Sequence, residues 1–118
     1  MRRDAPFRVG LLQGTLDLLI LRTLLAGPAH GHAIAKHIQR TSEERLQVET
    51  GSLYPALHRL EAKGWIAPSW ELSNKGKRAR FYRLTPLGRR QLAAERSKWD
   101  TFSRAMALIL NPVDQEAQ

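Results

Sequence analysis

The segment spanning residues 50–66 constrains the fold of this chain more than any other stretch. Leu53, Leu57 and Leu60 follow one another at intervals of four and three residues, so they would line one face of a helix. Gly64 can end that helix, and an apolar run typical of a strand comes next. The segment therefore predicts an amphipathic helix that buries its leucine face and leads into a strand.

The opposite face of this helix would carry small, aromatic and basic side chains. Thr50 or Ser52 can cap the helix, and a proline within or just beyond the first turn is tolerated because few N–H groups there have helical partners. The outward residues are expected to be Ser52, Pro55, Arg59 and Ala62, with Tyr54 and His58 on the flanks. Such a face suits a nucleic-acid groove, since hydroxyls reach phosphates and arginine binds guanine in bidentate geometry. On its own, the pattern also fits an ordinary amphipathic helix.

Composition limits the classes of function open to the chain. Its 118 residues suffice for one domain, and the absence of cysteine excludes disulfides and thiolate metal sites and fits a reducing cytoplasm. Nineteen basic against eleven acidic residues give a net charge of +8, which favours nucleic acid first and a membrane surface second. Arg2 and Arg3 before an apolar run imitate a signal peptide, but Asp17 and Arg22 interrupt that run, so we expect a cytoplasmic, nucleoid-associated protein.

The first half of the chain predicts a helix-turn-helix. Residues 1–10 would form a loose basic arm. A strongly apolar helix from Thr15 to about Ala26, capped by its threonine and with Asp17 in its first turn, would lie at the centre of the core. A second helix would run from Gly31 to about Arg40, and alternating apolar residues at 46–48 suggest a very short strand before the helix at Thr50.

Beyond Trp65 the apolar period changes from helical to two, which predicts a β-hairpin with a glycine-containing turn at residues 73–78. Pro68 would place the first strand at an edge of its sheet. Residues 73–90 contain no acid but seven cations, namely Lys75, Lys77, Arg78, Arg80, Arg83, Arg89 and Arg90. A solvated hairpin tip explains two or three of them. The concentration of positive charge, with no acid among these residues, favours an element that follows a phosphate backbone.

Thr85-Pro86 predicts the start of a last helix that would end near Leu110, before Asn111-Pro112. Apolar residues recur along it in a heptad pattern that only Glu95 interrupts, and they are Leu92, Trp99, Phe102, Met106, Ile109 and Val113. A second copy of the chain would cover this seam, which predicts a homodimer through Leu92, Trp99, Phe102, Met106 and Ile109. The alternative is a seam packed against the first helix of the same chain.

Several motifs in this order resemble the PadR family of bacterial transcriptional regulators, in particular its short members with a single C-terminal helix. The resemblance covers about residues 11–110. It rests on Gly14-Thr-Leu-Asp-Leu-Leu-Ile-Leu21, His30-Gly31, Gly51-Ser-Leu-Tyr-Pro-Ala-Leu57, Arg59-Leu-Glu61, Gly64, Phe81-Tyr82-Arg-Leu-Thr-Pro-Leu-Gly88 and Trp99. The string at residues 51–57 is highly specific to that family.

The resemblance implies a mainly α (α+β) winged helix-turn-helix that dimerises through its last helix, binds a palindromic operator and usually represses. It implies a basic arm at 1–10, a DNA-binding domain at 11–86, a dimerisation helix at 87–111 and a tail at 112–118. The residues expected at DNA are Lys36, Thr50, Ser52, Tyr54, Pro55, Arg59, Lys75, Lys77, Arg78 and Arg80. His32 stands where the family often has tyrosine, which leaves its DNA contact open.

A small-molecule site is a further expectation. Trp99 and its copy would meet beside Glu95 near the two-fold axis, and paired indoles could enclose a planar aromatic compound. Some relatives in the family respond to aromatic molecules. The simpler alternative is that Trp99 only fills the dimer core.

Other classes fit the sequence less well. His30, His32 and His37 are candidates for a metal site or an enzyme, but a pair spaced i, i+2 at a helix start converges poorly, so we expect neither metal, cofactor nor catalysis. A winged helix that binds only protein has no use for the basic hairpin. RNA is disfavoured because its deep major groove excludes a helix.

Overall fold

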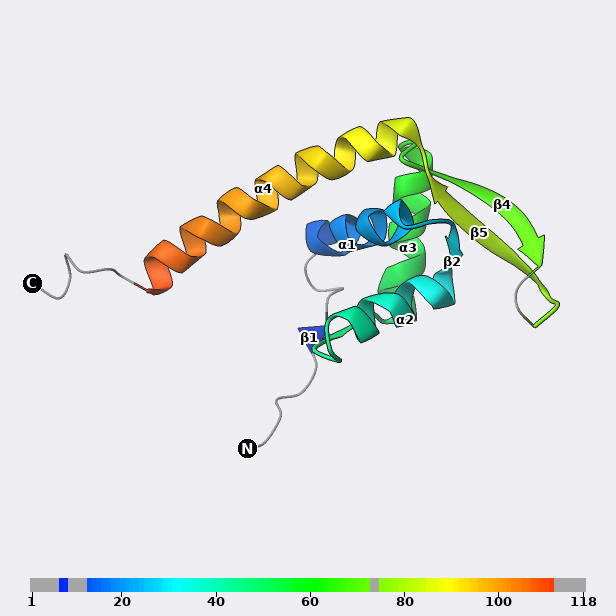
Figure 1. Ribbon diagram of the computed structural model, residues 1–118, viewed down its shortest axis with the longest axis horizontal. Coiled ribbons are helices and arrows are strands. Elements are labelled where there is room, and N and C mark those ends of the chain that lie inside the picture. Colours follow the sequence, from blue (N-terminus) through cyan, green and yellow to red (C-terminus); the bar gives the residue numbers. More distant parts are fainter. Residues whose placement is uncertain (1–6, 9–12, 73–74, 112–118) are drawn as a thin grey trace, which may run out of the picture.

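The computed structural model describes residues 7–8, 13–72 and 75–111, and these form a small α+β body from which one long helix projects (Figure 1). In chain order the elements are β1 (Phe7–Arg8), α1 (Gln13–Leu25), β2 (Ala29–His30), α2 (Gly31–Thr41), β3 (Leu46–Gln47), α3 (Thr50–Ala62), β4 (Ile66–Leu72), β5 (Arg78–Leu84) and α4 (Pro86–Leu110). The β4–β5 hairpin extends from one end of the body and α4 from the other.

Helix α1 is the centre of the core, as its apolar composition predicted. It packs against α2, α3, α4 and β5, and its Leu16, Ile20 and Leu21 are almost completely buried. The helix begins at Gln13, so the predicted cap at Thr15 is wrong, and Asp17 lies beyond the first turn. Asp17 is instead a buried acid, 8% exposed, on the core side of the helix.

Helices α2 and α3 have the predicted order and nearly the predicted bounds. His30 caps α2, with its Nδ1 accepting a hydrogen bond from the Ala33 N–H at 3.2 Å, a cap that sequence reasoning missed. Glu49, and neither Thr50 nor Ser52, occupies the N-cap position of α3, so that prediction is wrong.

Gly64 ends α3 as predicted. Its φ of 74° lies in the left-handed region that glycine adopts without strain. The Trp65 N–H donates to the Leu60 carbonyl at 3.0 Å and the Gly64 N–H donates to the Glu61 carbonyl at 2.9 Å. These two bonds form a Schellman motif, which satisfies the last carbonyls of the helix and turns the chain directly into β4.

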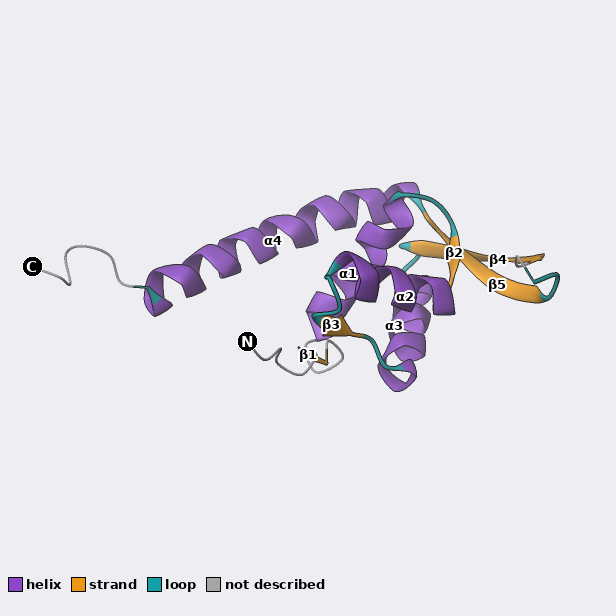
Figure 2. Ribbon diagram, turned by 60° about the horizontal axis from the view of Figure 1, so that its bottom comes forward, coloured by secondary structure: helices purple, strands orange, loops and turns teal. Residues whose placement is uncertain are grey.

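The hairpin belongs to a three-stranded antiparallel sheet in the order β2-β5-β4, gathered on one side of the helices in Figure 2. Pro68 is on β4, opposite Tyr82, and β4 is an edge strand, as predicted. Residues 73–74 of the predicted turn lie outside the described residues. The arm at 1–10 is not entirely loose, because Phe7–Arg8 pair in parallel with Leu46–Gln47, the predicted short strand; its other residues lie outside the description.

Helix α4 begins and ends where the sequence predicted. The Thr85 hydroxyl accepts a hydrogen bond from the Gly88 N–H at 2.9 Å and donates to the Gly64 carbonyl at 2.7 Å, which joins the start of α4 to the end of α3. A Cβ on Gly88 would lie 2.0 Å from the Trp65 carbonyl oxygen, so only glycine permits this approach. Asn111 is the C-cap, while Val113 and the tail at 112–118 lie outside the described residues.

Candidate nucleic-acid interface

Helix α3 presents an exposed arc whose centre differs from the predicted one. Its buried side consists of Leu53, Ala56, Leu57 and Leu60, and its exposed residues are Thr50, Gly51, Tyr54, Pro55, His58 and Ala62. With about 100° of rotation per residue, the exposed residues form one arc with His58 at its middle. Thr50, Tyr54 and Pro55 are therefore surface groups as expected, whereas Ser52 is half-buried.

Arg59 does not lie at the centre of that arc, which corrects the prediction for it. Its Nη2 donates a hydrogen bond at 2.8 Å to Asp17 Oδ1 on α1, and the two side chains are 32% and 12% exposed. Burial raises the pKa of the Asp17 carboxyl above its ordinary value, and the hydrogen bond and charge of Arg59 oppose that rise. Arg59 thus joins one flank of α3 to the central helix.

A second ion pair holds the opposite flank of α3. Arg80 of β5 donates from Nη2 to Glu61 Oε2 at 2.8 Å, with side chains 39% and 29% exposed, so Arg80 is not the unpaired wing cation that the sequence suggested. Its guanidinium also lies 5.9 Å from the Tyr82 ring centre. Among the described residues, Arg59 Nε, Glu61 Oε1 and Arg80 Nε are buried without a hydrogen-bond partner. Both pairs are therefore integral parts of the fold.

Three other cations of the hairpin, Lys75, Lys77 and Arg78, border a cleft shared with the start of α2. The cleft has a volume of about 420 Å³, and the charged and imidazole side chains that line it are Lys75, Lys77, Arg78, His30 and His32. The Arg78 guanidinium lies 5.2 Å from the Trp70 ring centre, a cation–π contact that supports the strand end. The exposed Lys36 is also on α2. The fold thus brings two basic elements, distant in sequence, into one surface.

The predicted seam on α4 divides into two parts. Leu92 is 7% exposed in the core formed with α1, so its placement at an exposed dimer seam is wrong and the intramolecular alternative holds for that residue. The other four predicted contacts are exposed, at 41% for Trp99, 56% for Phe102, 40% for Met106 and 73% for Ile109. The Trp99 and Phe102 rings lie 6.0 Å apart.

Trp99 also borders a cleft of about 350 Å³ between α1 and α4, lined by Leu18, Leu19, Arg22, Leu92, Arg96, Trp99 and Asp100. Glu95 is not part of this lining. Its carboxylate accepts from Lys98 Nζ at 3.4 Å, one turn further along the helix. The predicted pairing of Trp99 with Glu95 around a ligand therefore does not match the observed cleft.

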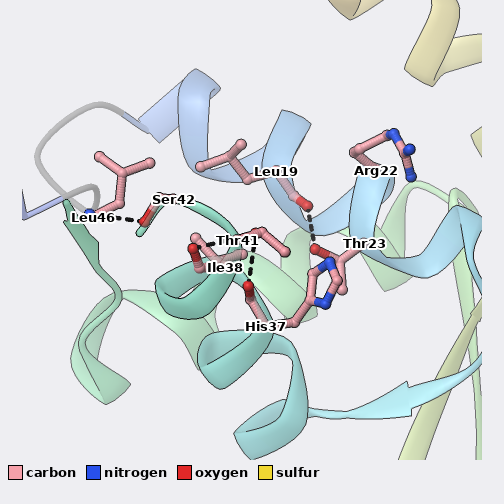
Figure 3. A pocket seen from close by; sticks show the side chains of 8 residues that line it. All are labelled: Leu19, Arg22, Thr23, His37, Ile38, Thr41, Ser42 and Leu46. Carbon is pink, nitrogen blue, oxygen red and sulfur yellow. Dashed lines mark hydrogen bonds between the residues drawn. The ribbon is translucent and has the colours of Figure 1, made fainter. Parts of the chain in front are cut away.

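A smaller cleft of about 220 Å³ lies on the other side of α1, against α2 (Figure 3). Its hydroxyl groups bond to helix backbone, with Thr23 Oγ1 donating to the Leu19 carbonyl and Thr41 Oγ1 to that of His37, both within 2.8 Å. Their hydrogen-bonding capacity is thus engaged within the helices.

The three histidines considered for a metal site do not assemble one. His30 and His32 stack with ring centres 6.4 Å apart, and His37 lies in the α1–α2 cleft. Within residues 7–8, 13–72 and 75–111, no three histidine or acidic side chains gather in a way that could hold a metal ion. None of the helices in these ranges is long and apolar enough to cross a membrane.

Comparison with known proteins agrees with this arrangement of elements. The model of the PadR-like family of transcriptional regulators matches residues 20–94, more than half of the chain. The chain belongs to this family. It is 38% identical over 92 residues to transcriptional regulator Rv3488 of Mycobacterium tuberculosis (strain ATCC 25618 / H37Rv), an alignment that covers 78% of this chain and 82% of that protein.

Solved structures of transcriptional regulators share the fold. A PadR family transcriptional regulator from Eggerthella lenta DSM 2243 superposes with a TM-score of 0.71 at 30% identity, covering 89% of each chain. A transcriptional regulator from Clostridium thermocellum superposes with a TM-score of 0.74 at 28% identity, covering 81% of this chain and 93% of that one. The protein is accordingly a winged-helix regulator of the PadR family, a family of DNA-binding transcription regulators and not of enzymes.

Proposed function

We propose that the protein is a cytoplasmic, sequence-specific repressor that binds a palindromic operator as a homodimer. The observation that carries the proposal is that Tyr54 of the exposed α3 arc packs against Gly31 at the start of α2, while the same end of α2 borders the basic cleft with the hairpin. A helix with small residues can enter a major groove, while lysine and arginine beside it neutralise the flanking phosphates.

The proposed contacts follow from exposure and charge. Thr50, Tyr54 and Pro55 face the groove on α3, with Ser52 at the edge of the arc. The phosphate contacts come from Lys36, Lys75, Lys77 and Arg78. In this proposal Arg59 and Arg80 act mainly by fixing α3, because their guanidinium groups are engaged by the buried carboxylate of Asp17 and the half-buried carboxylate of Glu61.

The proposed dimer rests on the distal half of α4. Trp99, Phe102, Met106 and Ile109 expose apolar surface along a helix that projects away from the body (Figure 1). A second copy would bury this surface and place two α3 helices on the same side of a duplex, with half-sites about one helical turn apart. Repression would follow where the operator overlaps a promoter.

An aromatic effector is the regulatory part of the proposal. The indole of Trp99 forms one wall of the α1–α4 cleft. The cleft has a volume of about 350 Å³, which is large enough for a small planar molecule. Titration of planar aromatic dyes against wild type and Trp99→Ala tests this, with the residual fluorescence of Trp65 and Trp70 as the internal control. Unchanged dye affinity in the variant would assign Trp99 to packing alone.

Selection of DNA fragments by the purified full-length protein tests the central proposal. Footprinting of the selected fragments and light scattering of the free protein should together give an inverted repeat and a dimer. A monomer at micromolar concentration, or selected fragments without a shared repeat, would contradict it.

A further inference from the structure

The base-reading residue of α3 can be inferred from the way this helix is fixed in the fold. On one flank Arg59 is bound to Asp17 of α1, and on the other Glu61 is bound to Arg80 of β5. Both arginines could have been base-reading groups by residue type. In each arginine Nη2 donates to a carboxylate instead, and Nε is buried. The group that reads the groove must then be sought among the exposed residues between these two flanks.

His58 occupies the middle of that arc, between Tyr54 one turn before it and Ala62 one turn after it. It also lines an open cleft of about 290 Å³ together with Glu61, Ala62 and Arg80. The alanine leaves space beside the imidazole, so the ring is accessible from solvent and a base edge could approach it.

The other residues of the arc lack a comparable polar group. Gly51, Pro55 and Ala62 have no side-chain hydrogen-bond donor, and Thr50 is the first residue of the helix, at its N-terminal end. The Tyr54 hydroxyl packs against the start of α2, where a Cβ on Gly31 would lie 2.9 Å from it. An imidazole has the required length and carries one N–H donor as well as one acceptor nitrogen.

We propose that His58 is the specificity-determining side chain of α3, donating a hydrogen bond to an acceptor on a purine edge, and that Arg59 and Glu61 are positioning residues. The proposal rests on the DNA binding proposed above and names the residue that carries its sequence preference. Purine N7 and guanine O6 are acceptors exposed in the major groove, as is thymine O4, whereas cytosine presents its N4 amino donor, so a single imidazole donor at one position discriminates against cytosine.

Relative affinities for a panel of single-base operator variants test the assignment. His58→Ala should lose on the order of 10-fold in discrimination at one base pair of each half-site. Its affinity for scrambled DNA and its thermal midpoint should stay unchanged, because the side chain is exposed and contacts no phosphate. His37→Ala is the matched control. It removes the same side chain from the α1–α2 cleft, away from the arc, and should keep the wild-type base preference.

The positioning part is tested at Arg59. Arg59→Gln should weaken binding to every operator variant alike, since the orientation of α3 is disturbed while its base-reading group is kept. Combining it with Asp17→Asn replaces the ion pair by a neutral amide pair, which should recover binding affinity while the wild-type preference is kept at every base pair. If the wild type selects a consensus and His58→Ala keeps the full base preference, the inference about His58 is overturned while the proposed DNA binding stands. Loss of preference at one base pair in the Asp17→Asn/Arg59→Gln protein likewise assigns base reading to Arg59. Failure of the wild type to select any consensus overturns the proposed function as well.

Discussion

Removing Arg59 from its ion pair with Asp17 should cost more stability than removing the charge of Asp17. In Arg59→Ala, a carboxylate that is 12% exposed loses its 2.8 Å donor. A charge-assisted hydrogen bond contributes about 1.5–3 kcal/mol to stability. Breaking a fully buried ion pair costs more, about 3–5 kcal/mol. That larger penalty is reduced here because the Arg59 side chain is itself one third exposed. We therefore expect a loss of roughly 2 kcal/mol, or about 8 °C in thermal midpoint.

Asp17→Asn should cost less, under about 1 kcal/mol. The amide oxygen still accepts from Arg59, and the guanidinium left without an acid is the more exposed partner. Burial already disfavours the ionised form of Asp17, as its raised pKa indicates, so removing that charge relieves part of the cost.

The difference in unfolding free energy between wild type and Arg59→Ala should also depend on pH. A carboxyl whose pKa is raised above 3.8 by folding stabilises the folded state most when it is protonated, and this contribution is lost as the pH rises through the raised pKa. Without Arg59 the pKa of Asp17 rises further. The deficit of the variant should therefore be complete at neutral pH and shrink as the pH falls toward 3.8.

Thermal and urea unfolding from pH 7 to pH 4 measure both the loss of stability in each variant and its pH dependence. The protein concentration is held constant, because the midpoint of an oligomer depends on it. A deficit of Arg59→Ala that is independent of pH would refute the electrostatic account. So would a loss in Asp17→Asn as large as that in Arg59→Ala.

Three further outcomes are expected. Gly88→Ala should lower the thermal midpoint by several degrees and disturb the start of α4, since its Cβ would meet the Trp65 carbonyl oxygen at 2.0 Å; an unchanged midpoint would contradict the geometry. Lys77→Ala should weaken binding to specific and scrambled DNA alike, and it should lower the slope of log affinity against log salt concentration by about one. Arg80→Ala should in addition lower the thermal midpoint, because it removes the ion pair with Glu61 of α3. Ile109→Asp should convert the proposed dimer into a monomer in light scattering, because the residue is 73% exposed on the proposed interface.

The elements that the sequence predicted well are those specified by local chemistry. Gly64 ends α3 because a left-handed residue is needed there, and Thr85-Pro86 starts α4 because a hydroxyl cap and a fixed φ both favour it. The hairpin followed from its period of two and its glycine turn. Each of these signals lies within a few residues of the feature that it specifies, so no knowledge of the tertiary packing was required.

Apart from the helix caps at Thr15 and at Thr50 or Ser52, the predictions that failed concern partners distant in the chain. Arg59 and Asp17 are separated by 42 positions, and Arg80 and Glu61 by 19. Helical spacing could place Arg59 near the surface, but only the packing of α1 against α3 decides whether its guanidinium faces solvent or an acid. One signal was available, since an acid within an otherwise apolar helix calls for a basic partner. The burial of Leu92 likewise depends on how α4 crosses α1.

The same packing gives a physical basis for the regulation through α4 that we propose. Helix α1 contacts α4 on one side and α3 on the other, and Asp17 of α1 holds α3 through Arg59. A change in how α4 crosses α1 would therefore reach α3 through this ion pair as well as through the apolar core. A ligand in the Trp99 cleft affects DNA binding only as far as it binds the two arrangements with different affinity. One that prefers the DNA-bound arrangement would strengthen operator binding, and one that prefers the other would release it, so the sign of the effect identifies the arrangement that the ligand stabilises.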